Sequence, residues 1–346
     1  MNPIQTCFFF ATCLVVGDLG YRVARRARVP SPALIGSMLA VGLASSAGVS
    51  LPGLMPVLRT GLQVVIGTVL GLRISREFAD QLKRMAGPAV VVSLWAVVTG
   101  LSGGMLLGMS NSISRATALF AATPGGISEM TLAAASFGAH TPTVAALQLA
   151  RVVGVLLVVP ALVNGRAEVA ATTVAPVPAR VAGPVQTLAL LATSGAGALF
   201  LQARGVPAGA LVGAMTVTAA SGLWKDRGRR SLHPAIVHWS QVGIGMTVGL
   251  SFTSETFAQL VRLVAPALLL NGIMLASGVA LAHLLHRWTG WDMVTCLLAS
   301  APAGLSQMGI LSEALGANVG VVSVLHIIRL VTVISVLLPL LGAVVP

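Results

Sequence analysis

The chain has 346 residues, of which 56% are hydrophobic and 9% are charged, and its formal net charge is +12 at pH 7. Soluble domains carry about 25% charged residues, so this composition excludes a domain that faces water on every side. The excess of Lys and Arg is typical of the cytoplasmic loops of membrane proteins. No segment is long enough to form the water-exposed basic face that nucleic-acid binding requires, so we expect the lipid bilayer, and no nucleic acid, as a partner.

Apolar segments follow one another from end to end, six in each half of the chain. The hydrocarbon core of a bilayer is about 30 Å thick and takes about 20 helical residues per crossing. Backbone groups in lipid must pair internally, and aromatic residues are too scarce for the girdles of a β-barrel, so we predict helices. The predicted segments lie at about 5–22, 32–48, 56–73, 86–109, 113–137 and 142–163, then at about 185–203, 206–223, 233–252, 261–285, 292–316 and 318–343.

Three motifs occur twice, in the same order. Chance similarity between apolar helices would not keep this register, so we predict a duplication, a common plan among membrane carriers. We divide the chain into a first membrane repeat at 1–163, a linker at 164–183 that is rich in Pro, Ala, Thr and Arg, and a second membrane repeat at 184–346. The matched motifs are VPSPALIGSML (29–39) and VPAGALVGAMT (206–216), QVVIGTVLGL (63–72) and QVGIGMTVGL (241–250), and ATPGGISEM (122–130) and SAPAGLSQM (300–308).

Basic loops occupy opposite positions in the two halves. They follow the first and third segments of the first half, but the second and fourth segments of the second half. If basic loops face the cytoplasm, the halves are inverted, and each must cross the membrane an odd number of times. We therefore predict an all-α polytopic membrane protein with two inverted repeats of about five transmembrane helices, plus one re-entrant or broken helix each. The basic residues are Arg22, Arg25, Arg26, Arg28, Arg73, Arg76, Lys83 and Arg84, then Lys225, Arg227, Arg229, Arg230 and Arg287.

The fifth segment of each half is the best candidate for the one that does not cross. Pro124-Gly125-Gly126 interrupts it in the first half, and Pro302-Ala303-Gly304 does so in the second. Pro removes a backbone donor and Gly loosens the chain, so each segment should form two half-helices joined by a tight turn. We favour a re-entrant hairpin. The alternative is a broken helix that crosses the membrane, with some other segment lying shallow.

Helix ends inside a membrane are tolerated only within protein or along an aqueous cavity. The N-terminus of a half-helix offers N–H donors and a partial positive charge, which suits a small anion or the carboxylate of a larger solute. Inverted repeats bring two such ends together near mid-membrane. The candidate substrate-binding residues at these ends are Gly125, Gly126, Ser128, Gly304 and Ser306.

An arginine stands near the middle of each last helix, Arg151 in the first half and Arg329 in the second. An arginine at a helix centre costs about 2.5–3.5 kcal/mol on insertion scales. One interpretation is recognition of an anion by a planar, charged fork, which adds both residues to the candidate substrate site. A second is an internal ion pair between Arg151 and Glu129, and a third is snorkelling to an interface.

Two titratable residues could couple binding to an ion, H⁺ or Na⁺. Glu129 could carry a proton if its surroundings favour the neutral acid. His326 stands one turn before Arg329 and is either a hydrogen-bonded core histidine or part of a proton relay. The duplication is asymmetric at both positions, since the equivalents are Gln307 and Gln148. No metal-ligand spacing and no cofactor motif is present, so we expect neither a metal nor a cofactor.

The whole chain resembles the AbrB-duplication family of bacterial inner-membrane proteins, which is distinct from the soluble, DNA-binding AbrB regulators. The residues that carry this resemblance are ATPGGISEM and SAPAGLSQM, each followed by a Gly-Ala turn and an Arg-bearing last helix, together with the repeated VPxxALxGxM. The family's labels imply regulation of gene expression or ammonia oxidation. A looser resemblance, at the level of fold, is to secondary carriers of carboxylates that contain paired glycine-rich hairpins.

These observations lead to one main prediction and one alternative. We predict a multi-pass secondary transporter of the bacterial inner (plasma) membrane that binds a small organic anion at a central site formed by the paired broken helices. The alternative is a membrane-embedded regulator of gene expression that senses a ligand without transporting it. We expect no enzymatic activity, because the sequence lacks the ligand set of an oxygenase, and we consider a homodimer as the assembly.

Overall fold

The protein is described by a computed structural model that covers residues 3–46, 55–109, 113–163, 180–206, 208–224 and 230–337. Most of the predicted linker, 164–179, lies outside the described residues, as do Lys225, Arg227 and Arg229 of one basic loop. The backbone at Ser306 is helical, but its side chain, a predicted substrate contact, also lies outside the described part.

The chain divides into two compact units, and each unit takes elements from both halves of the sequence. The first unit comprises Met1–Ser75 and Ala179–Gln259. Its elements are α1 (Pro3–Arg26), α2 (Pro32–Ser45), α3 (Met55–Leu72), β1 (Arg180–Val181), α9 (Pro184–Ala203), α10 (Gly209–Trp224), β2 (Arg230–Ser231) and α11 (Pro234–Gly249). The two short strands pair in parallel.

The second unit comprises Arg76–Pro178 and Leu260–Pro346. It contains most of α12 (Ser254–Thr289), a single long helix that begins in the first unit. The compact units are thus a different division of the chain from the predicted repeats, whose boundaries stay a prediction. The other elements of this unit are α4 (Arg76–Arg84), α5 (Ala86–Gly108), α6 (Arg115–Ala122), α7 (Ile127–Ser136), α8 (Thr141–Leu162), α13 (Met293–Ser300), α14 (Leu305–Ala314), α15 (Val319–Thr332) and a π-helical turn, η1 (Val333–Leu337).

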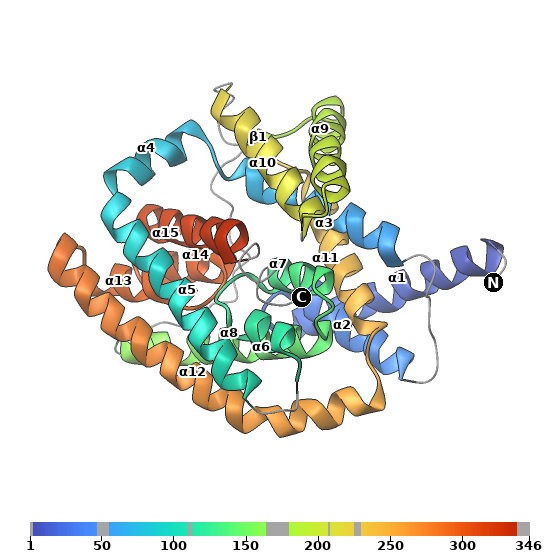
Figure 1. Ribbon diagram of the computed structural model, residues 1–346, viewed down its shortest axis with the longest axis horizontal. Helices are drawn as coiled ribbons and strands as arrows, with labels where there is room; N and C mark the ends of the chain where they lie inside the picture. Colours follow the sequence, from blue (N-terminus) through green and yellow to red (C-terminus); the bar gives the residue numbers. More distant parts are fainter. Residues whose placement is uncertain are drawn as a thin grey trace. The chain divides into compact units, whose positions relative to one another are not determined.

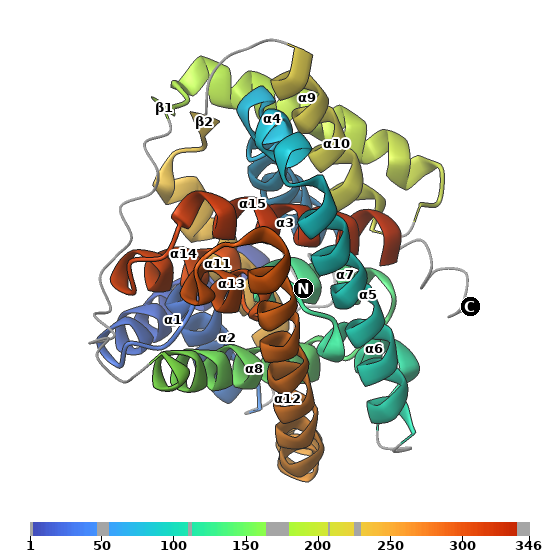
Figure 2. The same ribbon diagram turned by 90° about the vertical axis from the view of Figure 1, so that its left-hand side faces the viewer.

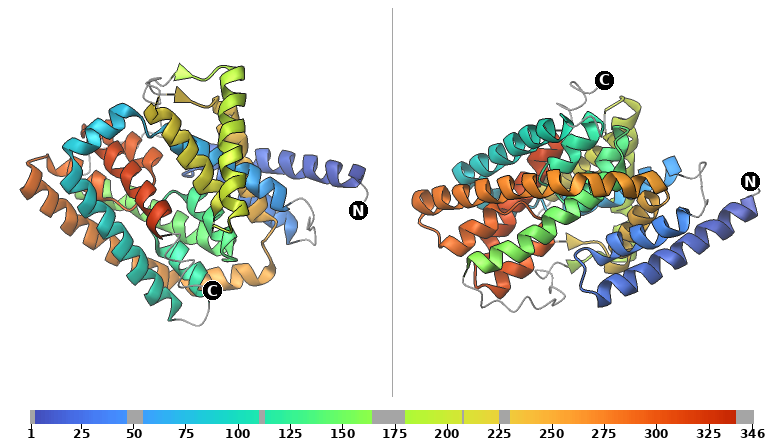
Figure 3. Two further views of the ribbon diagram at one scale, coloured as in Figure 1. Left: turned by 45° about the horizontal axis from the view of Figure 1, so that its top comes forward. Right: turned by 90° about the horizontal axis from the view of Figure 1, so that it is seen from below.

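Glycine explains the first two repeated motifs, because it lets helices of the first unit touch through their backbones. The helices α1 and α2 meet at Gly20 and Gly36, and α9 and α10 meet at the equivalent Gly197 and Gly213. In each of these pairs a Cβ on one glycine would overlap the backbone of the other. Figures 1 and 3 show α9 beside α10, and the right-hand view of Figure 3 shows α1 beside α2.

Each half also contributes one helix that packs on the other half. The helix α3 lies on α10 through Gly67 and Gly71, and α11 lies on α2 through Gly245 and Gly249. A Cβ at Gly71 would lie 2.6 Å from the carbonyl oxygen of Met215, and one at Gly249 would lie 2.6 Å from that of Met38. The same contact therefore occurs twice, with the halves exchanged.

The Gly-Ala pair of the third motif ends a helix in each half. Gly138 and Gly316 have φ values of 65° and 69°, which glycine adopts without steric cost. Beyond them, the N–H of Ala139 donates to the carbonyl of Ala134 at 3.1 Å, and that of Ala317 donates to Ser312 at 2.8 Å. These are the Schellman bonds that close a helix C-terminus.

In the second unit, α5 and α12 run side by side (Figures 1 and 3), with Trp95 Nε1 donating to Ser277 Oγ at 3.2 Å. Figure 2 shows α13 and α14 next to α15. The helix α4 is not predicted from the sequence, which places its charged residues in a basic loop. Only Phe78 of α4 is buried, so α4 lacks the regularly spaced apolar residues that indicate a membrane helix.

Five described helices are long and apolar enough to cross a membrane, which indicates a multi-pass membrane protein. The helices α2 and α10 are also apolar but have 14 and 16 residues, about 21–24 Å at 1.5 Å per residue, shorter than the bilayer core. The expected ten crossings and the inverted topology stay predictions. The five spans are Ala86–Gly108, Thr141–Leu162, Pro184–Ala203, Val261–Thr289 and Val319–Val336.

The close contact between α3 and α10 predicts that Gly71 is sensitive to substitution. Gly71→Ala should lower the free energy of unfolding by about 1–3 kcal/mol, since a new carbon would be forced against backbone. Gly61→Ala in the same helix is the matched control, because a Cβ there meets nothing within 4 Å. Thermal unfolding of the purified proteins measures both. Equal stability of the two variants would show that this face of α3 is not packed as described.

Candidate functional site

The broken fifth segment folds back on itself in both halves. The hydroxyl of Thr117, near the start of α6, accepts the N–H of His140, just before α8, at 2.9 Å. In the second half the hydroxyl of Thr295 accepts the N–H of Asn318 at 2.8 Å. The two ends of each segment are therefore joined, as in a hairpin, whereas a crossing helix would carry them to opposite faces. His140 is half-buried, and burial lowers its pKa.

In the first half, Arg151 binds the chain at the break between α6 and α7. Its Nη1 donates to the carbonyl of Thr123 at 2.9 Å, and its Nη2 donates to that of Gly125 at 3.1 Å. The break leaves such carbonyls without helical donors, and they carry the partial negative charge of a helix C-terminus. The guanidinium group, 1% exposed, thus stabilises the hairpin by holding two carbonyls with one planar fork.

Arg329 makes the same contacts in the second half, 178 residues later. It donates to the carbonyls of Ala301 and Ala303 at 2.7 and 2.6 Å, and its side chain is 2% exposed. All three residues are the equivalents of those in the first half. The third motif and the arginine that follows it are therefore one structural feature, a hairpin with its own cation.

Two of the alternatives for the arginines are wrong. Snorkelling is excluded because both guanidinium groups are buried against backbone carbonyls. The pair between Arg151 and Glu129 is not formed either, and neither arginine makes an ion pair with any described carboxylate. The physical reason is that the break offers Arg151 two carbonyl acceptors, while the carboxylate of Glu129 lies beside Gly126 at the start of α7.

Glu129 and its equivalent Gln307 lie over the N-termini of the second half-helices. A Cβ added at Gly126 would overlap the carboxylate of Glu129, and one at Gly304 would overlap the amide of Gln307. Each side chain occupies the third helical position and lies beside the N-cap glycine. Glycine at these two positions makes room for the side chain.

The remaining predicted contacts lie in the same region of the second unit. Ser128 is in the first turn of α7 and is 8% exposed. Gly125 packs against Met130, whose Cγ would lie 2.7 Å from an added Cβ. The structure thus places Gly125, Gly126 and Ser128 at one hairpin and Gly304 at the other. Whether these residues bind a substrate stays a prediction.

Gln148 and His326 occupy equivalent positions but bond differently. The side-chain amide of Gln148 donates to the carbonyls of Phe120 and Thr123 at 2.7 and 3.0 Å, and its oxygen accepts from Arg151. In an unbroken helix the carbonyl of Phe120 would accept a hydrogen bond from the N–H of residue 124, but Pro124 has no N–H. His326 instead directs Nδ1 to the carbonyl of Val322 at 2.9 Å. The sequence reading compared these two residues but did not foresee the hairpin contacts of Gln148 or of the two threonines.

Several polar atoms near the breaks are buried and have no hydrogen-bond partner. They include Nε of both arginines, Nε2 of His326 and the hydroxyl of Thr131. The charges of Arg151 and Arg329 also act on each other, so the two hairpins contribute to one electropositive region. Buried polar atoms without partners are rare in proteins and require an explanation, such as a bound solute or ion.

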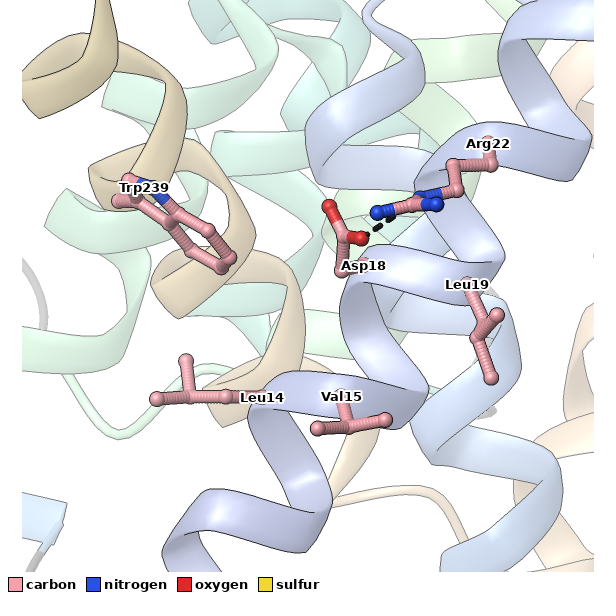
Figure 4. A pocket seen from close by; sticks show the side chains of 6 residues that line it. All are labelled: Leu14, Val15, Asp18, Leu19, Arg22 and Trp239. Carbon is pink, nitrogen blue, oxygen red and sulfur yellow. Dashed lines mark hydrogen bonds and ion pairs between the residues drawn. The ribbon is translucent and has the colours of Figure 1, made fainter.

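A separate pocket of about 270 Å³ lies in the first unit, between α1 and α11 (Figure 4). Asp18 pairs there with Arg22 at 2.8 Å, and Asp18 also lies 3.9 Å from Nε2 of His238. None of the predicted substrate or coupling residues lines this pocket. Its other lining residues are Leu14, Val15, Leu19 and Trp239.

Among the residues that the structure describes, no three His, Cys, Asp or Glu side chains are grouped so that they could hold a metal ion. The expected absence of a metal and of a cofactor stays a prediction.

A family model described as "Transition state regulatory protein AbrB" matches residues 1–87 and, in a second and overlapping match, residues 51–344. The chain belongs to this family. It is 29% identical over 295 residues to "Uncharacterized protein YhjN" of Bacillus subtilis (strain 168), a match that covers 80% of this chain and 76% of that protein. It is 22% identical over 313 residues to "Putative regulator AbrB" of Escherichia coli (strain K12), with 88% of each chain covered. These matches confirm the resemblance drawn from the hairpin motifs.

The joined hairpin ends predict which sites will react together with an impermeant thiol reagent. In a background without the native cysteines, Ser114→Cys and His140→Cys should be labelled from the same side of the membrane, because both lie at the base of the first hairpin. Asp292→Cys and Asn318→Cys, at the base of the second, should be labelled together from the other side if the halves are inverted.

The same labelling experiment has two contrary outcomes. Labelling of Ser114→Cys and His140→Cys from opposite sides would mean that the fifth segment crosses. Labelling of all four sites from one side would mean that the repeats are parallel.

Proposed function

We propose that this protein is a secondary transporter of a small organic anion in the bacterial inner membrane, and that it binds the anion at the paired hairpins of its second unit. The proposal goes beyond the finding of a multi-pass membrane protein of the AbrB family. We propose a carrier and not an enzyme.

The observation that carries the proposal is the pair of buried arginines. Each is at most 2% exposed, neither pairs with a described carboxylate, and each keeps a buried Nε–H without a partner. A buried cation without a counter-ion is costly at membrane depth. An anion that accepts from Arg151 and Arg329 would offset this cost, and a dianion would neutralise both charges.

The hairpins suit such a ligand in a second respect. Irregular backbone at membrane depth is accepted where it lines a cavity, and the half-helices α7 and α14 begin at the two breaks with the positive ends of their dipoles. The side chains beside these N-termini differ, since Glu129 is acidic and Gln307 is not. This difference leaves the second hairpin more positive, so we place the anion closer to Arg329.

A second candidate function is regulation of gene expression by a membrane-embedded sensor that uses the same site without turnover. The name of the Escherichia coli relative, "Putative regulator AbrB", favours it. The two functions share the binding step and differ in whether the bound anion leaves on the other side.

Binding is tested by the thermal stability of the purified protein in the presence of acetate, lactate, succinate or citrate. A carboxylate that binds the folded state should raise the midpoint of unfolding in a concentration-dependent way. Transport is tested by accumulation of the stabilising compound, isotopically labelled, in proteoliposomes under a pH or sodium gradient. Accumulation supports the transporter, and stabilisation without accumulation would support the sensor.

Arg329→Gln should abolish the stabilisation by carboxylates, and Arg151→Gln should weaken it. Arg262→Gln is the matched control, since it removes a cation from an exposed position of α12 and should leave the response unchanged. Both buried arginines also hold hairpin carbonyls, so the variants should first be shown to be monodisperse and helical. Unchanged carboxylate affinity in folded Arg329→Gln would sink the proposal.

A further inference from the structure

The imidazole of His326 is held by one nitrogen and left without a partner at the other. Nδ1 lies 2.9 Å from the carbonyl of Val322, four residues earlier in α15. A carbonyl can only accept, so Nδ1 carries the hydrogen. In the neutral ring Nε2 is then a bare acceptor, and it is buried without a hydrogen-bond partner in a side chain that is 2% exposed.

In the first half, the position equivalent to His326 has a hydrogen-bond donor that the neutral His326 ring lacks at Nε2. There the amide of Gln148 donates to Phe120 and Thr123 at the end of α6. The equivalent carbonyls at the end of α13 belong to Leu298 and Ala301, and that of Ala301 acts on the ring of His326. A bare Nε2 gives them nothing, whereas a protonated Nε2 would be a donor like the Gln148 amide. The position therefore fits a histidine that donates from both nitrogens.

Burial opposes that second proton most, and one positive charge opposes it further. Among the groups that the structure describes, the charge that acts on the ring is that of Arg329, one turn further along α15. The elements packed against α15 are α4, α5, α13, α14 and the π-helical turn. Their other titratable or charged groups are Arg76, Glu77, Asp80, Lys83 and Arg84 on α4, Asp292 and Cys296 at α13, and Glu313 on α14.

We propose that His326 is the coupling residue and that the coupling ion is a proton, taken up at Nε2 when an anion binds at Arg329. This inference rests on the proposed anion transport, and it chooses His326 over Glu129 as the coupling residue. The bound anion would offset the charge of Arg329, so that this charge would no longer oppose a proton on the ring, and by linkage each ligand strengthens the binding of the other. One proton leaves the aqueous phase for Nε2 with the anion, and both are released on the opposite side.

Glu129 is less suitable than His326 as the coupling residue. Its carboxylate lies over the N-terminus of α7, where a negative charge is stabilised by the helix dipole. Gln307, which cannot carry a proton at neutral pH, occupies the same place at α14. The place that these two residues share beside the N-cap glycine is therefore filled equally well by a side chain that cannot carry a proton.

The test uses calorimetric titration of the purified full-length protein with succinate at several pH values, with two buffers of different ionisation enthalpy at each pH. The wild type should take up about one proton per succinate bound, and its affinity should fall about tenfold per pH unit above the histidine titration. His326→Gln, which reproduces the residue of the first half, should still bind succinate but take up no proton and show no pH dependence.

His283→Gln is the matched control. His283 makes the same bond from Nδ1 to the carbonyl four residues earlier, at 2.9 Å, but is exposed. This variant should retain the wild-type proton uptake. Proton uptake that persists in His326→Gln would overturn the assignment and point to Glu129.

A measurement without added anion separates this inference from the proposed function. Nitrogen NMR of histidine-labelled protein in nanodiscs should show His326 with hydrogen on Nδ1 only, and Arg329→Gln should allow Nε2 to protonate at a higher pH. If Nε2 stays bare in both proteins over the whole range where they are folded, the proton site is disproved even if succinate binds. If Nε2 titrates as expected while succinate produces no binding heat, the proton site stands and the anion-transport proposal fails.

Discussion

A buried guanidinium group bound to two backbone carbonyls is the interaction on which the candidate site depends. Pro124 and Pro302 end a half-helix inside an apolar protein, and each break leaves carbonyl groups that water cannot reach. Arg151 and Arg329 supply the donors. Because the fork is planar and permanently charged, one side chain both satisfies two acceptors and balances the end of the helix dipole.

The same arrangement leaves these arginines able to combine their structural role with the proposed recognition of an anion. Each uses its Nη atoms on the chain and retains Nε without a partner. Holding the hairpin fixes the plane of the guanidinium group, and a fixed group loses little freedom when it binds a further acceptor. The second unit thus contains two cations that are already oriented, which suits binding of an anion more than pairing on an exposed surface would.

The sequence predicted much of the fold because apolar length and breaker residues report it directly. Most of the predicted helix ends lie within a few residues of the observed ones, and the proline-glycine breaks separate α6 from α7 and α13 from α14. The exceptions are α12, which begins at Ser254 and not at 261, and the last segment, whose predicted end at 343 lies outside the described residues. The prediction missed α4, whose polar residues have no apolar period of membrane length. It also missed the interleaving of the halves, because contacts such as that of Gly71 with Met215 join residues far apart in the chain, and no local pattern reports the partner.

The sequence indicated which residues belong to the candidate site, but it did not indicate their hydrogen-bond partners. Repetition indicated Arg151 and Arg329, yet composition could not distinguish a carbonyl from Glu129 as the partner. The clue was available in the fixed offset of 178 residues, since Thr117 and Thr295 recur with the arginines. What required coordinates was the direction of each side chain, above all that of Gln148 toward Phe120 and Thr123.

The contrast between Gln148 and His326 also suggests how a duplicated membrane protein acquires new chemistry. The arginine alone holds the second hairpin at Ala301 and Ala303, so the residue three positions earlier can change without dismantling the turn. In a duplicated chain, one half can hold its break with a neutral amide, while the equivalent position of the other half is free to carry a titratable ring. A structural redundancy between two copies thereby becomes room for divergence at a depth where most polar substitutions would be lost.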